Sequence, residues 1–144
     1  MEKRGSFIQK LKSFFKNNAH KWHINLVFLY GSWAKGFPHQ ESDIDLAILF
    51  SNKIKDDEET LSLITDISYQ LDQILSKEVN IISIDRDFSH PLLYYNAIVQ
   101  GIPIFVKDEG EYIRLKMEAI FQKEDFSLFG VRWQLNLAEK MLRR

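Results

Sequence analysis

The sequence predicts one domain with a mixed α/β (α+β) fold, in which a short sheet of three or four strands is flanked by helices. Two observations lead to this prediction. Apolar runs of strand length alternate with segments whose apolar residues recur at helical spacing. The 144 residues can bury one core, and no linker rich in proline, glycine or serine divides them. We therefore expect a domain at 1–110, with 111–144 as a helical extension packed on the same domain.

The first part of the chain predicts a helix and two strands. Ser6 is a suitable N-cap for a helix that reaches Asn18. Its apolar residues share one face and leave the lysines outside: Phe7, Ile8, Leu11, Phe14 and Phe15. The runs Ile24–Tyr30 and Ile44–Phe50 are apolar and contain β-branched and aromatic residues, as expected of buried strands.

The middle of the chain predicts two further helices and two further strands. Residues 56–75 have helical spacing, and four acidic residues at their start suit the positive end of the helix dipole. The third strand is Val79–Ile84. Pro91–Val99 is expected to be a helix, since proline suits a first turn and a glycine follows soon after its end. The fourth strand is Ile102–Val106, which Pro103 limits to a sheet edge or a strand start.

The C-terminal segment predicts helix from Glu111 onward, with a break around 127–130. Its apolar residues form two stripes at helical spacing: Ile113, Met117, Ile120 and Phe121 in the first, and Phe129, Trp133, Leu137 and Met141 in the second. A segment this apolar must cover something. We favour the interpretation that it caps the open face of the sheet. The alternative is a face for a partner or for a second copy in a homodimer.

Charge and composition exclude several functional classes. The net charge of −1 argues against a strongly basic non-specific nucleic-acid binder. This near-neutral total combines basic ends with an acidic middle between 24 and 110. Without cysteine, the chain forms neither disulfides nor Cys-ligated metal sites. The apolar runs are far shorter than the about 20 residues of a membrane span, so we expect a cytoplasmic protein with no membrane contact.

Two short motifs between the first and second strands indicate chemistry. Gly31-Ser32 closes the first strand, and Asp43-x-Asp45 opens the second after ten intervening residues. Because side chains alternate along a strand, both aspartates lie on one face, where their charges repel each other. A divalent cation would offset this repulsion, and Mg²⁺ takes carboxylate and phosphate oxygens as ligands. Gly31 allows close backbone approach, and a helix that begins at Ser32 would direct N–H groups and a hydroxyl toward a phosphate.

These motifs resemble the hallmark of the nucleotidyltransferase superfamily of the DNA polymerase β type. The resemblance is strongest to the minimal nucleotidyltransferases, small bacterial and archaeal proteins with little beyond the catalytic fold. It lies in Gly-Ser-Trp-Ala-Lys-Gly at 31–36 and Ser-Asp-Ile-Asp-Leu at 42–46, and extends more weakly from the first helix to about Lys107. It implies the polymerase-β-type nucleotidyltransferase fold, and transfer of a nucleoside monophosphate, most often AMP from Mg·ATP, to a hydroxyl with release of pyrophosphate.

The resemblance also implies roles for individual residues. Asp43 and Asp45 would be catalytic and would hold the metal, while Gly31, Ser32 and Lys35 would bind the phosphates of the nucleotide. Lys35 stands where the family usually has arginine, so it keeps the charge but loses the bidentate fork.

The sequence departs from the family at a third catalytic position on the later strand. The family commonly has a carboxylate there, and this chain has Asn80. An amide oxygen can ligate a metal weakly but cannot accept a proton as a general base. Glu78 shares the strand parity of Asn80 and is the nearest substitute carboxylate. The resemblance therefore implies nucleotide and metal binding more directly than turnover.

Small members of this family are often encoded beside a HEPN-domain protein, a helical ribonuclease toxin, and act as its antitoxin. The resemblance therefore implies a HEPN-type protein as partner and as acceptor of the nucleotide. A second hypothesis is a binding module that keeps the fold, has lost turnover and neutralises the partner by contact. Transfer to a small molecule is a third, although 144 residues hardly hold the extra substrate domain. RNA tailing is less favoured, since the chain lacks a basic groove beyond its N-terminal lysines.

Overall fold

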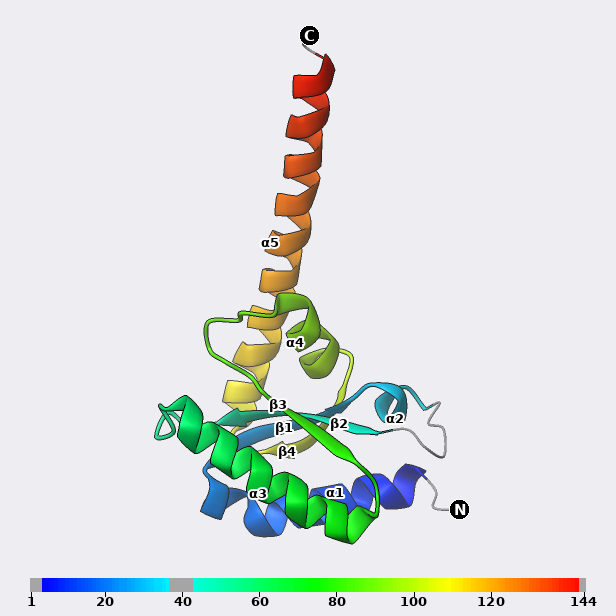
Figure 1. Cartoon of the computed structure of the whole chain (residues 1–144), viewed down its shortest axis with the longest axis vertical. Helices are drawn as coiled ribbons and strands as arrows, with labels where there is room; N and C mark the ends of the chain where they lie inside the picture. The colour runs from blue at the N-terminus through cyan, green and yellow to red at the C-terminus, as the bar shows by residue number, and fades with distance from the viewer. Residues whose placement is uncertain (1–3, 37–42, 143–144) are drawn as a thin grey trace.

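The computed structural model describes residues 4–36 and 43–142, and within α5 it describes no side chains at 126–138. Four strands form one mixed sheet in the order β3-β2-β1-β4 (Figure 1). The strands are β1 (Ile24–Tyr30), β2 (Ile44–Phe50), β3 (Val79–Ser83) and β4 (Ile102–Val106). β1 is antiparallel to both of its neighbours, whereas β2 and β3 run parallel. The prediction of a short mixed sheet is confirmed, and β4, which contains a proline, lies at an edge.

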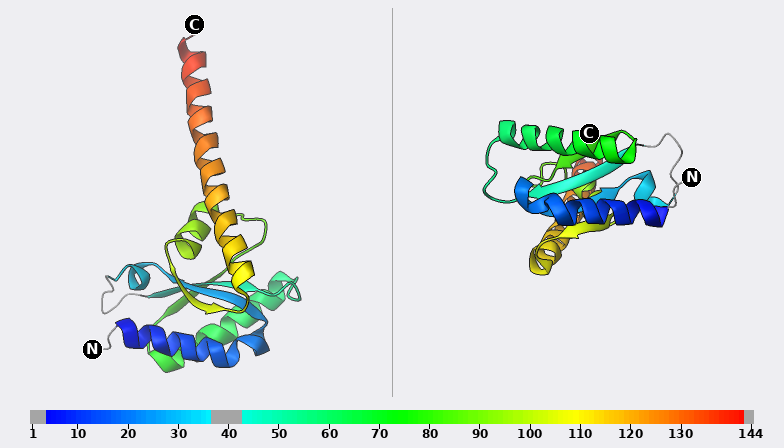
Figure 2. Two further views of the ribbon diagram at one scale, coloured as in Figure 1. Left: turned by 180° about the vertical axis from the view of Figure 1, so that it is seen from behind. Right: turned by 90° about the horizontal axis from the view of Figure 1, so that it is seen from below.

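Two helices cover one face of the sheet, α1 (Arg4–Asn18) and α3 (Asp57–Leu75) (Figures 1 and 2). α3 is the crossover that parallel strands require, and Asp56 caps it by accepting hydrogen bonds from the N–H groups of two acidic residues of its first turn. α1 begins two residues before the predicted N-cap Ser6, so Ser6 lies within the first turn of the helix. A 3-10 turn, η1 (Ala19–Trp22), follows, and its Trp22 indole donates to the carboxylate of Asp66 at 3.0 Å.

The opposite face carries α4 (Pro91–Ile98) and the start of α5 (Glu109–Leu142). Buried residues of this layer come from both helices and from the strands: Leu26, Phe28, Ala47, Leu49, Tyr94, Ala97, Leu115 and Ala119. The end of α4 approaches β1 closely at Gly101, where a Cβ would collide with the backbone oxygens of Ala97 and Leu29. Glycine is therefore required at this junction.

α5 is one continuous helix of 34 residues, so the predicted break around 127–130 is wrong. A single Gly130 costs a helix only about 1 kcal/mol relative to alanine, which does not force an end. The part up to Ala119 packs on the sheet, and the second half extends away from the body (Figure 1). The predicted stripe members Phe129, Trp133 and Leu137 lie outside the described side chains. None of the described helices is long and apolar enough to cross a membrane.

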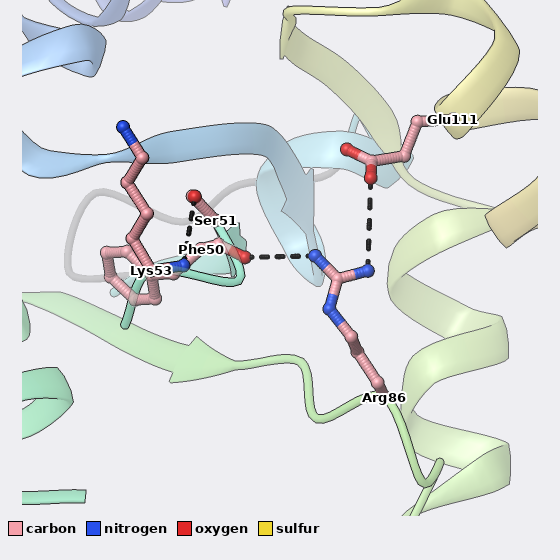
Figure 3. Close-up of polar contacts among 5 residues, drawn as sticks. All are labelled: Phe50, Ser51, Lys53, Arg86 and Glu111. Atoms are coloured by element: carbon pink, nitrogen blue, oxygen red, sulfur yellow. Dashed lines mark hydrogen bonds and ion pairs between the residues drawn. The ribbon is translucent and has the colours of Figure 1, made fainter. Parts of the chain in front are cut away.

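One arginine ties the start of α5 to the sheet (Figure 3). Arg86 follows β3, donates to the backbone oxygen of Phe50 at 3.3 Å and lies 3.8 Å from the carboxylate of Glu111. In the turn after β2, the N–H of Lys53 donates to the hydroxyl of Ser51. The loop after β3, the end of β2 and the start of α5 are thus joined at one corner of the molecule.

Candidate active site

Strand register brings the predicted acidic residues together with Asn80. Asp45 pairs with Tyr30 on the antiparallel neighbour and with Asn80 on the parallel neighbour. The parallel ladder begins where the N–H of Ile44 donates to the backbone oxygen of Glu78 at 2.9 Å. The Asn80 amide nitrogen then lies 3.3 Å from Oδ2 of Asp43 and 3.5 Å from Oδ1 of Asp45. Three polar side chains therefore meet where β2 and β3 begin.

The alternation of β2 determines which side of the sheet these groups face. Ile44, Leu46 and Ile48 are buried in the layer of α1 and α3, and Ala47 and Leu49 in the layer of α4 and α5. Asp45 shares the parity of Ala47 and Leu49, so its carboxylate faces the α4–α5 side. Tyr30 packs against the same layer. The acidic pair thus opens toward the side from which α5 rises.

Electrostatics at the pair follow from burial and from its neighbours. The pKa of Asp45 is raised above its usual value, mainly because the side chain is half-buried. The negative charge of Asp43 adds to this increase, and the hydrogen bond from Asn80 opposes it. Burial also raises the pKa of Tyr30, and the charge of Asp45 adds to this effect. Ionised carboxylates only accept hydrogen bonds, so Asn80 must present its NH₂ group to both of them.

The donor set contains two carboxylates and one amide. Within 4–36 and 43–142, no group of three or more His, Asp or Glu side chains forms a metal site. Glu78, the substitute carboxylate suggested by the sequence, is exposed just before β3. Hard oxygen donors of this kind suit Mg²⁺, which usually takes one or two carboxylates from the protein and the rest from phosphates and water.

The Gly31–Ser32 turn lies directly against the acidic pair. Gly31 has φ +76°, and a Cβ at this position would collide with Oδ2 of Asp45. Only glycine combines this backbone conformation with such close approach. The backbone oxygen of Gly31 accepts from the N–H groups of Ala34 and Lys35, which form the short helix α2 (Ser32–Lys35).

The two other side chains of α2 named by the motif have different environments. Lys35 is exposed, so its charge is available at the turn. Trp33 is 5% exposed and stacks on Phe7, with ring centroids 4.3 Å apart, so it is a core residue. Ser42 of the second motif and His39 of the intervening loop lie outside the described residues.

Sequence reasoning missed Tyr30 as a neighbour of the acidic pair. The sequence did contain a signal for this contact. Tyr30 ends the first strand and Asp45 is the second residue of the next, so the two residues face each other when these strands pair antiparallel across their connecting loop. Another surface pocket of about 560 Å³ lies at the far ends of β2 and β3, lined by Lys55, Asp57 and Arg86 among others. This pocket includes none of the predicted site residues. We therefore place the candidate site at the starts of β2 and β3, where the two carboxylates and the Asn80 amide meet.

Comparisons with known proteins identify the family of the chain. Residues 9–110 match the family described as polymerase beta, nucleotidyltransferase. No curated protein sequence matches the chain.

Chains in several solved toxin–antitoxin structures share the fold. One structure, with AMP-PNP, contains a chain of 19% identity and TM-score 0.64. A second is a mutant MntA–HpeT toxin–antitoxin, with 17% identity and TM-score 0.63. A third is a tri-AMPylated HEPN toxin of Shewanella oneidensis in complex with an MNT antitoxin, with 15% identity and TM-score 0.60. Each match covers 93% of this chain and 98% of the other.

At these identities the structures show a common fold, and the family match shows descent. The family match spans most of the chain and includes the Gly31-Ser32 turn, the Asp43-x-Asp45 pair and the strand that carries Asn80. The chain belongs to the polymerase β-type nucleotidyltransferase family.

Proposed function

We propose that this protein transfers a nucleoside monophosphate, AMP from Mg·ATP, to a hydroxyl of a HEPN-type toxin and so acts as its antitoxin in the cytoplasm. The observation that carries the proposal is the acidic pair, held by strand register directly beside the Gly31–Ser32 turn. Family membership and the shared fold with toxin–antitoxin chains support it. One of those structures holds an ATP analogue and another an AMPylated toxin.

The residues present fit a magnesium–nucleotide complex. Asp43 and Asp45 offer carboxylate oxygens, and the absence of a side chain at Gly31 lets the backbone of the turn lie directly against the Asp45 carboxylate. When bound, Mg²⁺ would hold the triphosphate and offset charge at the transferring phosphorus. The Ser32 hydroxyl and the exposed Lys35 ammonium would bind the outer phosphates and orient the α-phosphate toward the acceptor.

The acceptor side of the site is less complete. Asn80 can orient a hydroxyl or ligate a metal through its oxygen, but it cannot accept the proton that the acceptor loses. We therefore expect slow transfer compared with a relative that has a carboxylate at this position.

The presence of Asn80 in place of a carboxylate also favours the alternative function, a binding module without turnover. The Asn80 amide donates to both carboxylates and so holds the pair in its place without a cation. A chain that neutralises its partner by contact would need the fold but no reaction.

One labelling experiment separates the two functions. The chain is incubated with Mg²⁺, α-labelled ATP and the protein encoded beside it, and labelled partner is measured. Transfer predicts a labelled partner with the natural chain and with Asp57→Ala, an exposed acidic control on α3, and no label with Asp43→Ala. An unlabelled partner that is still inhibited by both the natural chain and Asp43→Ala would establish the binding module instead.

A further inference from the structure

An apolar surface on α5 is left uncovered by the domain. Six of the ten large hydrophobic side chains that are exposed among the described residues lie on this helix. Four of them recur at positions i, i+4, i+7 and i+8, with exposed fractions of 55%, 52%, 38% and 59%: Ile113, Met117, Ile120 and Phe121. We call these four residues the α5 stripe.

The α5 stripe differs from the face that anchors the helix. Leu115 and Ala119 are buried against the sheet and α4, and Tyr112 packs on Phe28 with ring centroids 5.6 Å apart. Stripe members lie one or two positions from these residues, which turns them about 100° to 200° around the helix. A helix needs one apolar face to pack on its own domain. The second face is therefore available to another molecule.

The later part of the same helix extends away from the domain. Beyond the stripe, α5 continues to Leu142 and extends past α4 into solvent in both side views (Figures 1 and 2). Met141 and Leu142 are 68% and 86% exposed. Most helices in water gain their stability from tertiary packing, and isolated ones are marginal. A projecting helix thus gains stability when a partner packs along it.

The orientation of the acidic pair indicates which partner this is. Asp45 faces the α4–α5 side of the sheet, so a protein acceptor must approach from that side to bring its hydroxyl to the site. The matches to chains of toxin–antitoxin structures cover 93% of this chain, so the shared fold includes most of α5. The stripe offers roughly 300–400 Å² of apolar surface, less than half of the about 800 Å² that one partner contributes to a standard interface. An occupant must therefore contact α5 beyond the stripe as well.

We propose that the α5 stripe is the docking surface for the protein that carries the acceptor hydroxyl, and that it binds an apolar groove or helix face of that protein. This inference rests on the proposed protein acceptor. It gives α5 the role of holding the acceptor while the acidic pair faces the same side. Methionine and aromatic side chains, which the stripe contains, are enriched at such interfaces.

The test compares charge substitutions on two helices. Met117→Glu and Phe121→Glu place a charge on the stripe, and Leu61→Glu places the same charge at a 65% exposed position of α3, on the opposite face of the sheet. Affinity of the full-length variants for the protein encoded beside the chain is measured by titration calorimetry, with circular dichroism as the check of folding. We expect each stripe substitution to raise Kd at least about 10-fold, and Leu61→Glu to change it less than about 2-fold.

Three results would overturn the proposal: stripe variants that bind as the natural chain does, an equal loss in Leu61→Glu, or a natural chain that does not bind this protein. A homodimer in sedimentation velocity that the stripe variants dissociate, with partner affinity unchanged, would instead assign the stripe to a second copy.

Transfer kinetics keep this inference separate from the proposed function. If the stripe docks the acceptor, stripe variants raise KM for the acceptor and leave kcat and KM for ATP unchanged. If the natural chain transfers nothing while the stripe variants still lose the partner, the docking surface stands and the transferase proposal fails.

Discussion

Replacing Asn80 by aspartate tests the geometry of the site most directly. The substitution puts a carboxylate where an amide now lies 3.3 Å and 3.5 Å from two others. Unit charges at about 3.4 Å repel by about 1 kcal/mol in water and by about 5 kcal/mol at an effective dielectric constant of 20. Because Asn80 and Asp43 are exposed, the lower end applies to them. We expect Asn80→Asp to lose about 1–3 kcal/mol of unfolding free energy in EDTA at neutral pH, or about 3–10 °C in Tm.

Magnesium should reverse this loss, because the third carboxylate becomes a ligand. The assay is thermal unfolding of the natural chain and of Asn80→Asp, in EDTA and in a Mg²⁺ series with and without AMP-PNP. Asn80→Ala removes the amide without adding a charge, and Asn52→Asp adds a charge in an exposed turn at the other end of β2. Without AMP-PNP, we expect Mg²⁺ to stabilise Asn80→Asp more than the natural chain, Asn80→Ala or Asn52→Asp. Equal stability of Asn80→Asp and the natural chain in EDTA, with equal responses to Mg²⁺, would refute the arrangement of the three side chains.

Four further substitutions test other features. Gly31→Ala should destabilise the fold by about 1–3 kcal/mol in urea unfolding and abolish AMP-PNP binding, since its Cβ would occupy the space beside Asp45 at a positive φ. Asp45→Asn should raise stability at pH 7 in EDTA, because burial raises the pKa of Asp45 and its charge is unfavourable there; the gain should vanish as the pH falls below that raised pKa. Burial raises the pKa of Asp85, but hydrogen bonds from Ser89 and Tyr94 outweigh it and leave the pKa lowered. Asp85→Asn should therefore cost stability at pH 7, and the cost should disappear as the pH falls through that lowered pKa. Arg86→Ala should cost about 1 kcal/mol in urea unfolding, through its bonds to the end of β2 and to α5.

Most of the fold could be predicted from the sequence because local patterns and tertiary packing agree. Three of the four strands have the predicted bounds, and the third ends one residue earlier, although Ile84 still donates to the backbone oxygen of Ile48. Pro103 correctly indicated an edge strand. Sheet order and strand direction were not predicted, since they depend on long-range pairing that no local signal encodes. The continuity of α5 was missed because serine and glycine at 127–130 predict a break that a long helix tolerates.

The site could be predicted in its composition but not in its contacts. Alternation alone placed Asp43 and Asp45 on one face. That Asn80 donates to both of them depends on the parallel register of β2 and β3, which the sequence does not specify. The collision that makes glycine necessary at residue 31 likewise depends on the distance between two strands. The roles of these residues in binding metal and nucleotide remain predictions.

The sheet separates two hydrophobic layers of unequal size. The layer of α1 and α3 buries several large aromatic rings, among them Phe7, Phe15 and Trp22, whereas the layer of α4 and α5 is smaller and includes three alanines. Less apolar burial means a lower free energy of local opening. The thinner layer is also the one toward which Asp45 faces. We therefore expect α4 and α5 to exchange their amide protons through partial openings that leave α1 and α3 intact, so that the chain can rearrange its functional side while most of its stability is held on the other.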